Sequence, residues 1–368
     1  MLVIAFRVDA SIDIGSGHVM RCLTLANALR QLGAECVFIC REHPGNLIEH
    51  IRKYDFEVYT LPVVDVEPSN ESVEAFRSIH SDWLGSTWMH DATASLALLN
   101  GLKPHWFIVD HYALDEQWES FVRPYCSYLG VIDDLHDRHH NCDLLVDQTL
   151  GLTPDIYAPL VPTSCDVLTG AIYALLRPEF KEYRLESIKR RDASPKLKHI
   201  FVNLGGVDKN NITSRVLSGI DQSVLLNDCK ITVVMGATSQ NVEQVKAKAE
   251  ALRMDVTVLV GANNMAELMS EADLAIGAAG STTWERCCLG LPSIMVVLAE
   301  NQRDIAEQLS NRSIADVVFN INTDFENNIA SALNRFTPEK LDLLSHASRR
   351  VTDGGGATFV AARIFNKE

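Results

Sequence analysis

The chain has 368 residues, of which 47% are hydrophobic and 22% are charged, so it is long enough for two globular domains with cores of their own. Its formal net charge is −15 and its Lys and Arg residues form no basic stripe. We therefore expect no nucleic-acid partner, because binding to a phosphate backbone needs clustered cations. No apolar run reaches the length of a membrane span, so no membrane partner is expected either.

Nine cysteines, an odd number, follow no disulfide or metal-binding spacing. The short apolar segment at residues 1–6 is followed directly by the charged residues Arg7 and Asp9. It lacks the basic region and the longer apolar region of a signal peptide. These features predict reduced thiols and a cytoplasmic protein.

In the first half of the chain, short apolar runs alternate with longer helical stretches. A helix is predicted over 18–32, where apolar residues recur at helical spacing. This alternation is typical of a parallel sheet covered by helices, and it predicts a first domain over 1–185. The strands are predicted over 2–8, 36–40, 107–110 and 129–133.

The pattern breaks over 175–196, where prolines and charged residues indicate the crossing into a second domain, 186–368. The basic run at 189–191 is interpreted as solvent-exposed. A final helix is predicted over 357–365, and it is a candidate to pack back on the N-terminal domain. Strands of the second domain are predicted over 200–204, 231–235, 256–260, 274–276 and 293–297.

Two such domains predict an α/β protein with two Rossmann-like doubly wound sheets that face each other across a cleft. Ligands of open α/β sheets bind at the carboxyl ends of the strands. Glycine and polar residues directly after predicted strands are therefore the candidate site.

The first group of this kind follows the first predicted strand. Gly15 and Gly17 permit a tight turn close to a ligand. His18 begins the next helix, where a neutral imidazole can act as a general base on water. The group is not a dinucleotide fingerprint, which has a third glycine, nor a P-loop, which continues with Gly-Lys-Ser/Thr. The structural alternative is a capping histidine beside a turn.

The second group follows the strand at 274–276. Ser281 is predicted as the N-cap of a helix, and the backbone N–H groups of Ser281 and Thr282 are placed to hold a diphosphate. Glu285 lies one turn further along, where its carboxylate can accept hydrogen bonds from two ribose hydroxyls. The same residues also fit a purely structural capping box.

Acidic residues follow two strands of the first domain: Asp110 precedes His111 and Tyr112, and Asp133 precedes Asp134. Such pairs suit sugar hydroxyls, the positioning of a base, or a metal. No third ligand stands at a fixed helical spacing, so a metal is not predicted.

Two further polar groups have structural alternatives. The histidines at 136, 139 and 140 are interpreted as an exposed turn and not as a zinc site. Asn301 and Gln302 follow the strand at 293–297, where they contact a phosphate or sugar, or Asn301 caps a helix.

In this order and spacing, the motifs resemble the PseG-type hydrolases of pseudaminic acid biosynthesis, which act on UDP-2,4-diacetamido-2,4,6-trideoxy-β-L-altropyranose. The resemblance extends over most of the chain. The matching segments are 9–11 with 14–21, 108–112, Gly170 with 173–180, Gly205 and Gly206 with Asp208, and 280–282 with 284–286.

The resemblance implies a GT-B fold similar to that of the MurG-type glycosyltransferases. It implies hydrolysis of the anomeric C1–O bond with inversion, by a monomer that needs no metal or other cofactor. The products would be UDP and 2,4-diacetamido-2,4,6-trideoxy-L-altrose, a precursor for a flagellin or surface glycan.

The resemblance also assigns roles to the candidate residues. It implies that His18 is catalytic, that Asn301 lies near the diphosphate and that the backbone at Met265 clamps the uracil. The implied substrate-binding residues are Gly15, Gly17, Arg21, Asp110, His111, Tyr112, Asn301 and Gln302. The implied UDP-binding residues are Gly205, Gly206, Met265, Gly280, Ser281, Thr282 and Glu285.

Three other functions stay open. A GT-B glycosyltransferase would pass the sugar of a UDP-sugar donor to a carbohydrate acceptor. A UDP-sugar 2-epimerase of related fold would rearrange the sugar, and a sugar-nucleotide-binding protein would bind without turnover.

Overall fold

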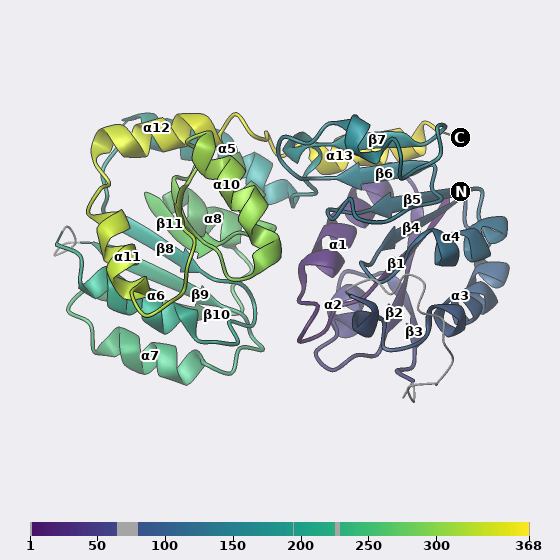
Figure 1. The fold of residues 1–368 in the computed structure, drawn as a ribbon, viewed down its shortest axis with the longest axis horizontal. Helices are drawn as coiled ribbons and strands as arrows, with labels where there is room; N and C mark the ends of the chain where they lie inside the picture. Colours follow the sequence, from purple (N-terminus) through teal and green to yellow (C-terminus); the bar gives the residue numbers. More distant parts are fainter. Residues whose placement is uncertain (1, 65–79, 194, 225–228, 368) are drawn as a thin grey trace. The chain divides into compact units, whose positions relative to one another are not determined.

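The computed structural model describes residues 2–64, 80–193, 195–224 and 229–367 (Figure 1). The chain forms two compact units, the first made of Met1–Leu175 with Gly356–Glu368 and the second of Leu176–Gly355. The expected boundary between 185 and 186 is therefore wrong. Helix α5 (Pro178–Ala193) belongs to the second unit because it packs on α8 (Met265–Glu271) and α9 (Thr282–Cys288).

The first unit is built on a seven-stranded parallel sheet of order β3-β2-β1-β4-β5-β6-β7. The chain winds outward from β1 in both directions, so the order reverses between β1 and β4. The strands are β1 Val3–Val8, β2 Glu35–Arg41, β3 Glu57–Leu61, β4 Trp106–Asp110, β5 Tyr128–Ile132, β6 Leu144–Asp147 and β7 Asp166–Thr169. The helices are α1 Gly17–Gln31, α2 Ile48–Arg52, η1 Ser81–Leu84, α3 Trp88–Leu102, α4 Glu116–Val122, η2 Arg123–Tyr125, η3 Pro154–Tyr157, η4 Ala171–Tyr173 and α13 Gly356–Phe365.

Alternating side chains of the strands bury both faces of this sheet. Phe6 and Ile108 lie in one core with α1 and α13, whereas Ala5 and Phe107 lie in the other with α3 and α4. Helix α13, the last of the chain, packs against α1 within the first unit (Figure 1).

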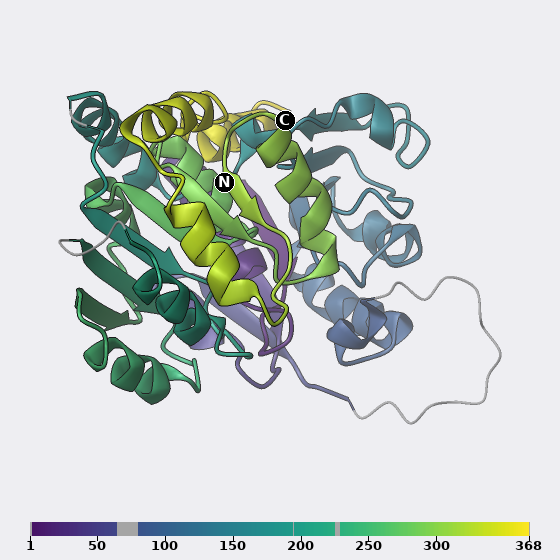
Figure 2. The ribbon, with the colours of Figure 1, turned by 60° about the vertical axis from the view of Figure 1, so that its left-hand side comes forward.

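The second unit has a six-stranded parallel sheet of order β10-β9-β8-β11-β12-β13, which reverses between β8 and β11. One face is covered by α6, α7 and α11 (Figure 2). The strands are β8 His199–Asn203, β9 Lys230–Met235, β10 Asp255–Val260, β11 Leu274–Ala278, β12 Ser293–Val296 and β13 Asp316–Val318. The other helices are α6 Ile212–Asp221, α7 Val242–Glu250, η5 Glu300–Gln302, α10 Arg303–Asn311, α11 Phe325–Leu333 and α12 Pro338–Ser348. Two doubly wound units are thus confirmed.

In the basic run at 189–191, Lys189 is exposed as interpreted, but Arg191 is not. The Arg191 guanidinium is buried and donates hydrogen bonds to the carbonyl oxygens of Met269, Ser270 and Ala272 at 3.0, 3.2 and 2.8 Å. Carbonyls at a helix end lack partners within the helix, so Arg191 caps the C-terminus of α8 and attaches α5 to it. Burial lowers the pKa of Arg191 to about 9.

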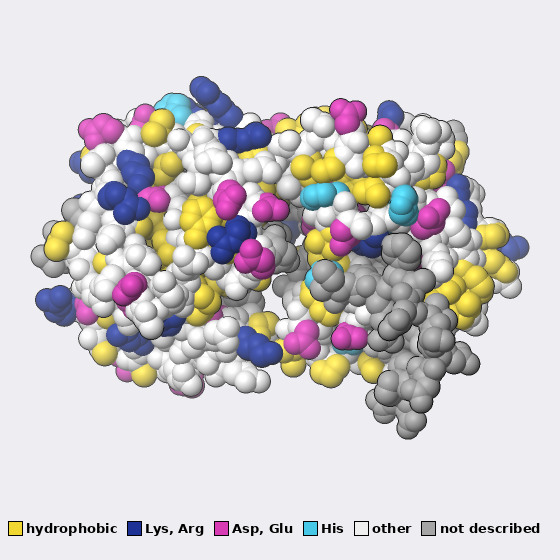
Figure 3. All heavy atoms as spheres, in the orientation of Figure 1, with side chains coloured by type: hydrophobic (Ala, Val, Ile, Leu, Met, Phe, Trp, Pro, Cys, Tyr) yellow, Lys and Arg dark blue, Asp and Glu magenta, His cyan; other side chains and the backbone are white. Residues whose placement is uncertain are grey.

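On the face of the protein drawn in Figure 3, Lys and Arg side chains are scattered among acidic ones. Of the helices that the structure describes, none combines the length and the apolar character of a bilayer crossing.

Candidate functional site

His18 and Asp110 meet at the switch point of the first unit, where β1 and β4 end. Between β1 and α1 the chain turns sharply: Gly15 has φ +79° and its N–H donates to the Ser11 carbonyl at 2.9 Å. The turn places His18 in the first turn of α1, with its Nδ1 2.6 Å from Asp110 Oδ1. A carboxylate only accepts, so Nδ1 carries the proton and Nε2 is left as a base. In the neutral ring, His18 thus has Nε2 as its free acceptor.

Arg21 holds this carboxylate in place from the next turn of α1. Its Nε and Nη2 lie 2.7 Å from the two oxygens of Asp110, and its Nη1 lies 2.6 Å from Asp134 Oδ2. Burial alone would raise the pKa of Asp110, but the charges of Arg21 and His18 and their hydrogen bonds hold it well below its usual range. Asp110 thus stays ionised beneath the imidazole.

Aromatic rings line one side of His18. The Tyr112 ring meets the imidazole edge-on at 4.6 Å between centroids, and its hydroxyl donates to Asp134 Oδ2 at 3.0 Å. Trp83 from η1 stacks on Tyr112 at 5.8 Å, with His80 4.5 Å from the Trp83 ring. Trp83 and His80 were not predicted for the site, because they follow no predicted strand.

His111 belongs to a different group from its neighbour Asp110. Its Nδ1 accepts the Ala113 N–H at 3.1 Å, so Nε2 carries the proton and faces Asp9 Oδ2 at 3.3 Å. Asp9 also forms two hydrogen bonds with Arg7, of 2.6 and 2.8 Å. Burial lowers the pKa of His111, which keeps it neutral. The expected substrate-binding side chain is thus part of a buried polar network.

The expected exposed turn of histidines is wrong for His140. This side chain is 2% exposed, and its Nδ1 lies 2.7 Å from Glu119 Oε1 of α4. Burial alone would lower the pKa of His140, but the charge of Glu119 raises it. His140 therefore attaches the loop after β5 to α4.

Asp147, at the end of β6, is a buried acid with a perturbed proton affinity. Its Oδ1 accepts the Thr149 N–H at 2.7 Å and its Oδ2 the Tyr157 hydroxyl at 2.9 Å. Burial and the negative charge of Asp134 raise the pKa of Asp147 from 3.8 to about 6.

We expect Asp147→Asn to stabilise the protein at neutral pH. The folded state binds this proton more tightly than the unfolded chain, so wild-type stability falls as the pH rises from 3.8 to about 6. The variant keeps an oxygen acceptor for the Thr149 N–H and removes the charge, which should raise the free energy of unfolding at pH 7.5 by on the order of 2 kcal/mol. Urea unfolding at pH 7.5 and pH 4 measures this difference. An equal gain at both pH values would contradict the linkage.

In the second unit, backbone loops approach one another at the ends of β8 and β9. Gly205 has φ +101°, which a glycine adopts without strain. A Cβ built on Gly236 would lie 2.0 Å from the Gly206 carbonyl oxygen, so these two loops touch through backbone alone. Gly205 and Gly206 thus follow the carboxyl end of β8.

The loop after β11 leads through Gly280 into α9. Ser281 occupies the N-cap position of α9, but its side chain makes no capping hydrogen bond, and α9 begins at Thr282. Glu285 Oε1 instead lies 3.4 Å from Arg177 Nη2. The capping-box interpretation is therefore wrong for the residues described here.

Glu285 has an unused acceptor. Its Oε2 is buried and finds no hydrogen-bond donor in the described part of the chain. Burial raises the pKa of Glu285, and the charge of Arg177 offsets part of this rise. A buried carboxylate oxygen without a donor is costly, so a ligand hydroxyl at this position would be bound favourably.

The remaining candidates lie at helix starts of the second unit. Met265 begins α8 and is 9% exposed. Gln302 accepts the Leu298 N–H at 2.9 Å through Oε1, which ties it to its own loop, and it occupies the N-cap position of α10 that was expected for Asn301. The side chain of Asn301 lies outside the described part of the structure.

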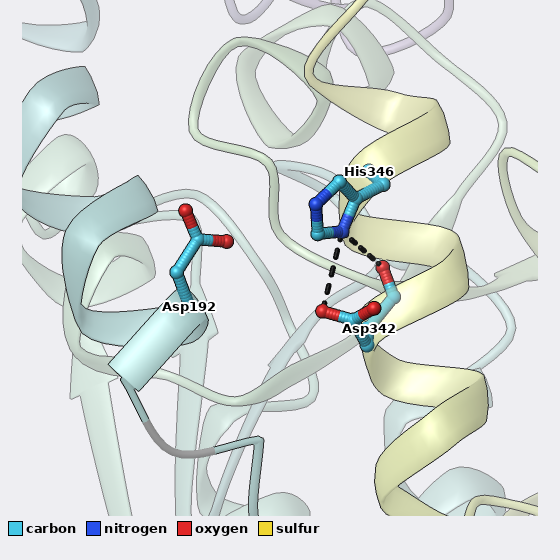
Figure 4. A group of neighbouring side chains, drawn as sticks. All are labelled: Asp192, Asp342 and His346. Atoms are coloured by element: carbon cyan, nitrogen blue, oxygen red, sulfur yellow. Dashed lines mark hydrogen bonds and ion pairs between the residues drawn. The ribbon is translucent and has the colours of Figure 1, made fainter.

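Three side chains on α5 and α12 form a group with metal-ligand atoms within 4.8 Å of one another: Asp192, Asp342 and His346 (Figure 4). Asp192 and Asp342 are exposed, and each already has a partner. Asp192 pairs with Arg349 at 2.9 Å, and Asp342 with His346 at 3.2 Å. None of the residues predicted for the site belongs to this group.

Two doubly wound parallel sheets in one chain, with glycine and polar residues at their switch points, define the GT-B fold. The chain has this fold: it aligns with the crystal structure of MurG from Acinetobacter baumannii at a TM-score of 0.68, over 100% of both chains and with 15% sequence identity. Residues 199–356 match the glycosyltransferase family 28 C-terminal domain.

Among curated proteins, the chain is similar to the UDP-2,4-diacetamido-2,4,6-trideoxy-β-L-altropyranose hydrolase of Campylobacter jejuni. The two are 24% identical over 312 residues, which cover 84% of this chain and 96% of that hydrolase. The chain is also 25% identical over 306 residues to the protein MJ1062 of Methanocaldococcus jannaschii, covering 82% of this chain. It spans only 57% of the length of that second relative.

Proposed function

We propose that the protein hydrolyses UDP-2,4-diacetamido-2,4,6-trideoxy-β-L-altropyranose at the anomeric C1–O bond with inversion, releasing UDP and 2,4-diacetamido-2,4,6-trideoxy-L-altrose. The observation that carries the proposal is the His18–Asp110 pair, with 2.6 Å between Nδ1 and Oδ1, which leaves His18 Nε2 as a base. The similarity to the C. jejuni hydrolase over 96% of its length supports the substrate class.

In the proposed mechanism, His18 Nε2 takes a proton from water while the water oxygen attacks C1 on the side opposite UDP. The C1–O bond breaks and its electron pair leaves with the diphosphate. Asp110 balances the charge of the imidazolium, and Arg21 keeps Asp110 ionised and oriented. A positioned base contributes about 10²–10⁴-fold to the rate.

The proposed substrate contacts divide between the two units. In the first, the Gly15–Gly17 turn and Tyr112 surround the sugar. In the second, backbone at Gly205, Gly206 and Met265 and the loop at 280–282 bind UDP, and Glu285 Oε2 accepts hydrogen bonds from the ribose hydroxyls.

The experiment that tests the function is time-resolved proton NMR of the protein with this UDP-sugar, with EDTA and without an acceptor. We expect UDP together with free sugar that appears first as the inverted anomer. Release of UDP only after a carbohydrate acceptor is added would replace the hydrolase by a GT-B glycosyltransferase. A rearranged sugar still attached to UDP would indicate an epimerase, and binding without change an inactive carrier.

Glu285→Gln tests the ribose contact. The amide of Gln has one oxygen acceptor and one NH2 donor, so the variant loses one of the two acceptors of the carboxylate. We expect UDP to bind about tenfold more weakly to the variant, and 2′-deoxy-UDP to lose much less affinity. Isothermal titration calorimetry measures both. Glu179→Gln is a matched control, because Glu179 is the other partner of Arg177, at 3.0 Å. Equal losses for the two nucleotides would remove the contact from the proposal.

A further inference from the structure

Arg286 in α9 is a buried cation that forms no salt bridge with any described residue. It is 2% exposed, and its Nη2 donates to two neutral groups, the Ala278 carbonyl at 2.8 Å and the Thr283 hydroxyl at 3.1 Å. Its Nε is buried and has no acceptor among the described residues. Among the residues that the structure describes, no carboxylate lies within salt-bridge distance of the Arg286 guanidinium.

The guanidinium lies at the switch point of the second unit. Gly277 of β11 pairs with Asn203 of β8 at the last rung of their ladder. A Cβ built on Gly277 would lie 2.1 Å from Arg286 Nη1 and 2.9 Å from the Asn203 carbonyl oxygen. Glycine at 277 therefore makes room for the guanidinium at the edge where α/β folds bind their ligands.

Other buried arginines of the chain have their charge compensated. Arg7 is paired with Asp9 and Asp91, and Arg21 with Asp110 and Asp134. Arg191 lacks a carboxylate, but it caps the C-terminus of α8, which carries partial negative charge.

Arg286 has neither a salt-bridge partner among the described residues nor a helix C-terminus to cap. Burial lowers its pKa to about 10, although the charges of Cys287 and Glu285 offset part of this effect, so Arg286 stays charged at neutral pH as an incompletely compensated buried cation. An anion bound at the loop above it would offset this cost.

We propose that Arg286 is the cation that stabilises the diphosphate of UDP, both bound and as it leaves. It acts as a positioning residue: it holds the loop that precedes α9 through the Ala278 carbonyl and supplies positive charge beneath it. When the C1–O bond breaks, the electron pair moves onto a diphosphate oxygen, and the added negative charge strengthens this attraction. The inference rests on the proposed function, from which it takes UDP as the leaving group.

The test compares UDP with uridine by calorimetry in two variants. Arg286→Gln keeps a donor for the Ala278 carbonyl and removes the charge, whereas Arg286→Lys keeps the charge. We expect Arg286→Gln to weaken UDP binding about tenfold or more and uridine binding less than about twofold, and Arg286→Lys to retain most of the UDP affinity. Arg191→Gln is the matched control, a second buried arginine whose loss should lower the melting temperature without changing the ratio of the two affinities.

Equal losses for UDP and uridine in Arg286→Gln would overturn the inference, and so would a wild-type protein that binds uridine as tightly as UDP. Rescue by Arg286→Lys supports it, because packing alone would not follow charge. If Arg286→Gln weakens UDP binding as expected but the wild-type protein releases no sugar, the hydrolase proposal is wrong and the inference on Arg286 stands. If the wild-type protein hydrolyses the UDP-sugar normally but Arg286→Gln leaves the UDP affinity unchanged, the hydrolase proposal stands and the inference on Arg286 is wrong.

Discussion

Replacing His18 by Asn is expected to lower kcat by about 10²–10⁴-fold while UDP affinity changes less than about twofold. An amide occupies a similar volume but cannot take a proton from water. In the proposal UDP is bound by the second unit, whereas His18 lies in the first, so ground-state binding of UDP should survive. Steady-state release of UDP gives kcat, and calorimetry gives the affinity.

His139→Asn is the matched control for this substitution. His139 is an exposed histidine of the same unit, and no role is assigned to its side chain, so its replacement should leave kcat unchanged. Near-normal turnover in His18→Asn would exclude His18 as the base, and a parallel loss of UDP affinity would place His18 in ground-state binding instead.

Asp91→Ala is expected to lower the free energy of unfolding of the first unit by about 3–5 kcal/mol. Asp91 in α3 is fully buried, and it accepts hydrogen bonds from Arg7 Nη2, Arg41 Nη2 and Trp118 Nε1 at 2.7, 2.5 and 3.0 Å. Burial alone would raise its pKa, but the charges of Arg7 and Arg41 lower it. Its removal leaves the Arg7 guanidinium with Asp9 alone and takes from the Arg41 guanidinium the carboxylate with which it is paired.

Urea unfolding followed by tryptophan fluorescence measures this loss, because four of the five tryptophans, 83, 88, 106 and 118, lie in the first unit. Asp137→Ala is the control: Asp137 pairs with Arg138 at 2.9 Å, but its side chain is 46% exposed. A surface pair of this kind contributes less than about 1 kcal/mol. A loss in Asp91→Ala no larger than in the control would show that the network contributes no stability.

The elements with strong local periodicity were predictable from the sequence. The strand expected over 36–40 is Glu35–Arg41, and the helix expected over 18–32 is Gly17–Gln31. A strand buried on both faces of a parallel sheet is a short continuous apolar run, whereas a helix repeats apolar residues every 3.6 positions, and both patterns are local. Short strands such as β6 and β7, and β13 with three residues, lack enough repeats and were not predicted.

The composition of the site was partly predictable as well. The turn that brings His18 to the start of α1 is encoded by the glycines that precede it. The sequence also identified Asp110, because it ends an apolar strand. It did not distinguish Asp110 from His111, although successive residues of an extended chain point to opposite sides and only Asp110 meets His18.

What only the tertiary structure decided are the contacts between residues far apart in the chain. Asp110 lies 92 positions from His18, and Trp83 reaches the same site from a segment without any recognisable motif. The environment of buried charges is decided in the same way: Arg191 caps the C-terminus of α8, whereas Arg286 Nε has no acceptor among the described residues. Local periodicity determined where the strands and helices of this protein lie. Which of their side chains meet, and which buried charges remain uncompensated, depends on how the strands are ordered in the two sheets, and no local pattern encodes that order.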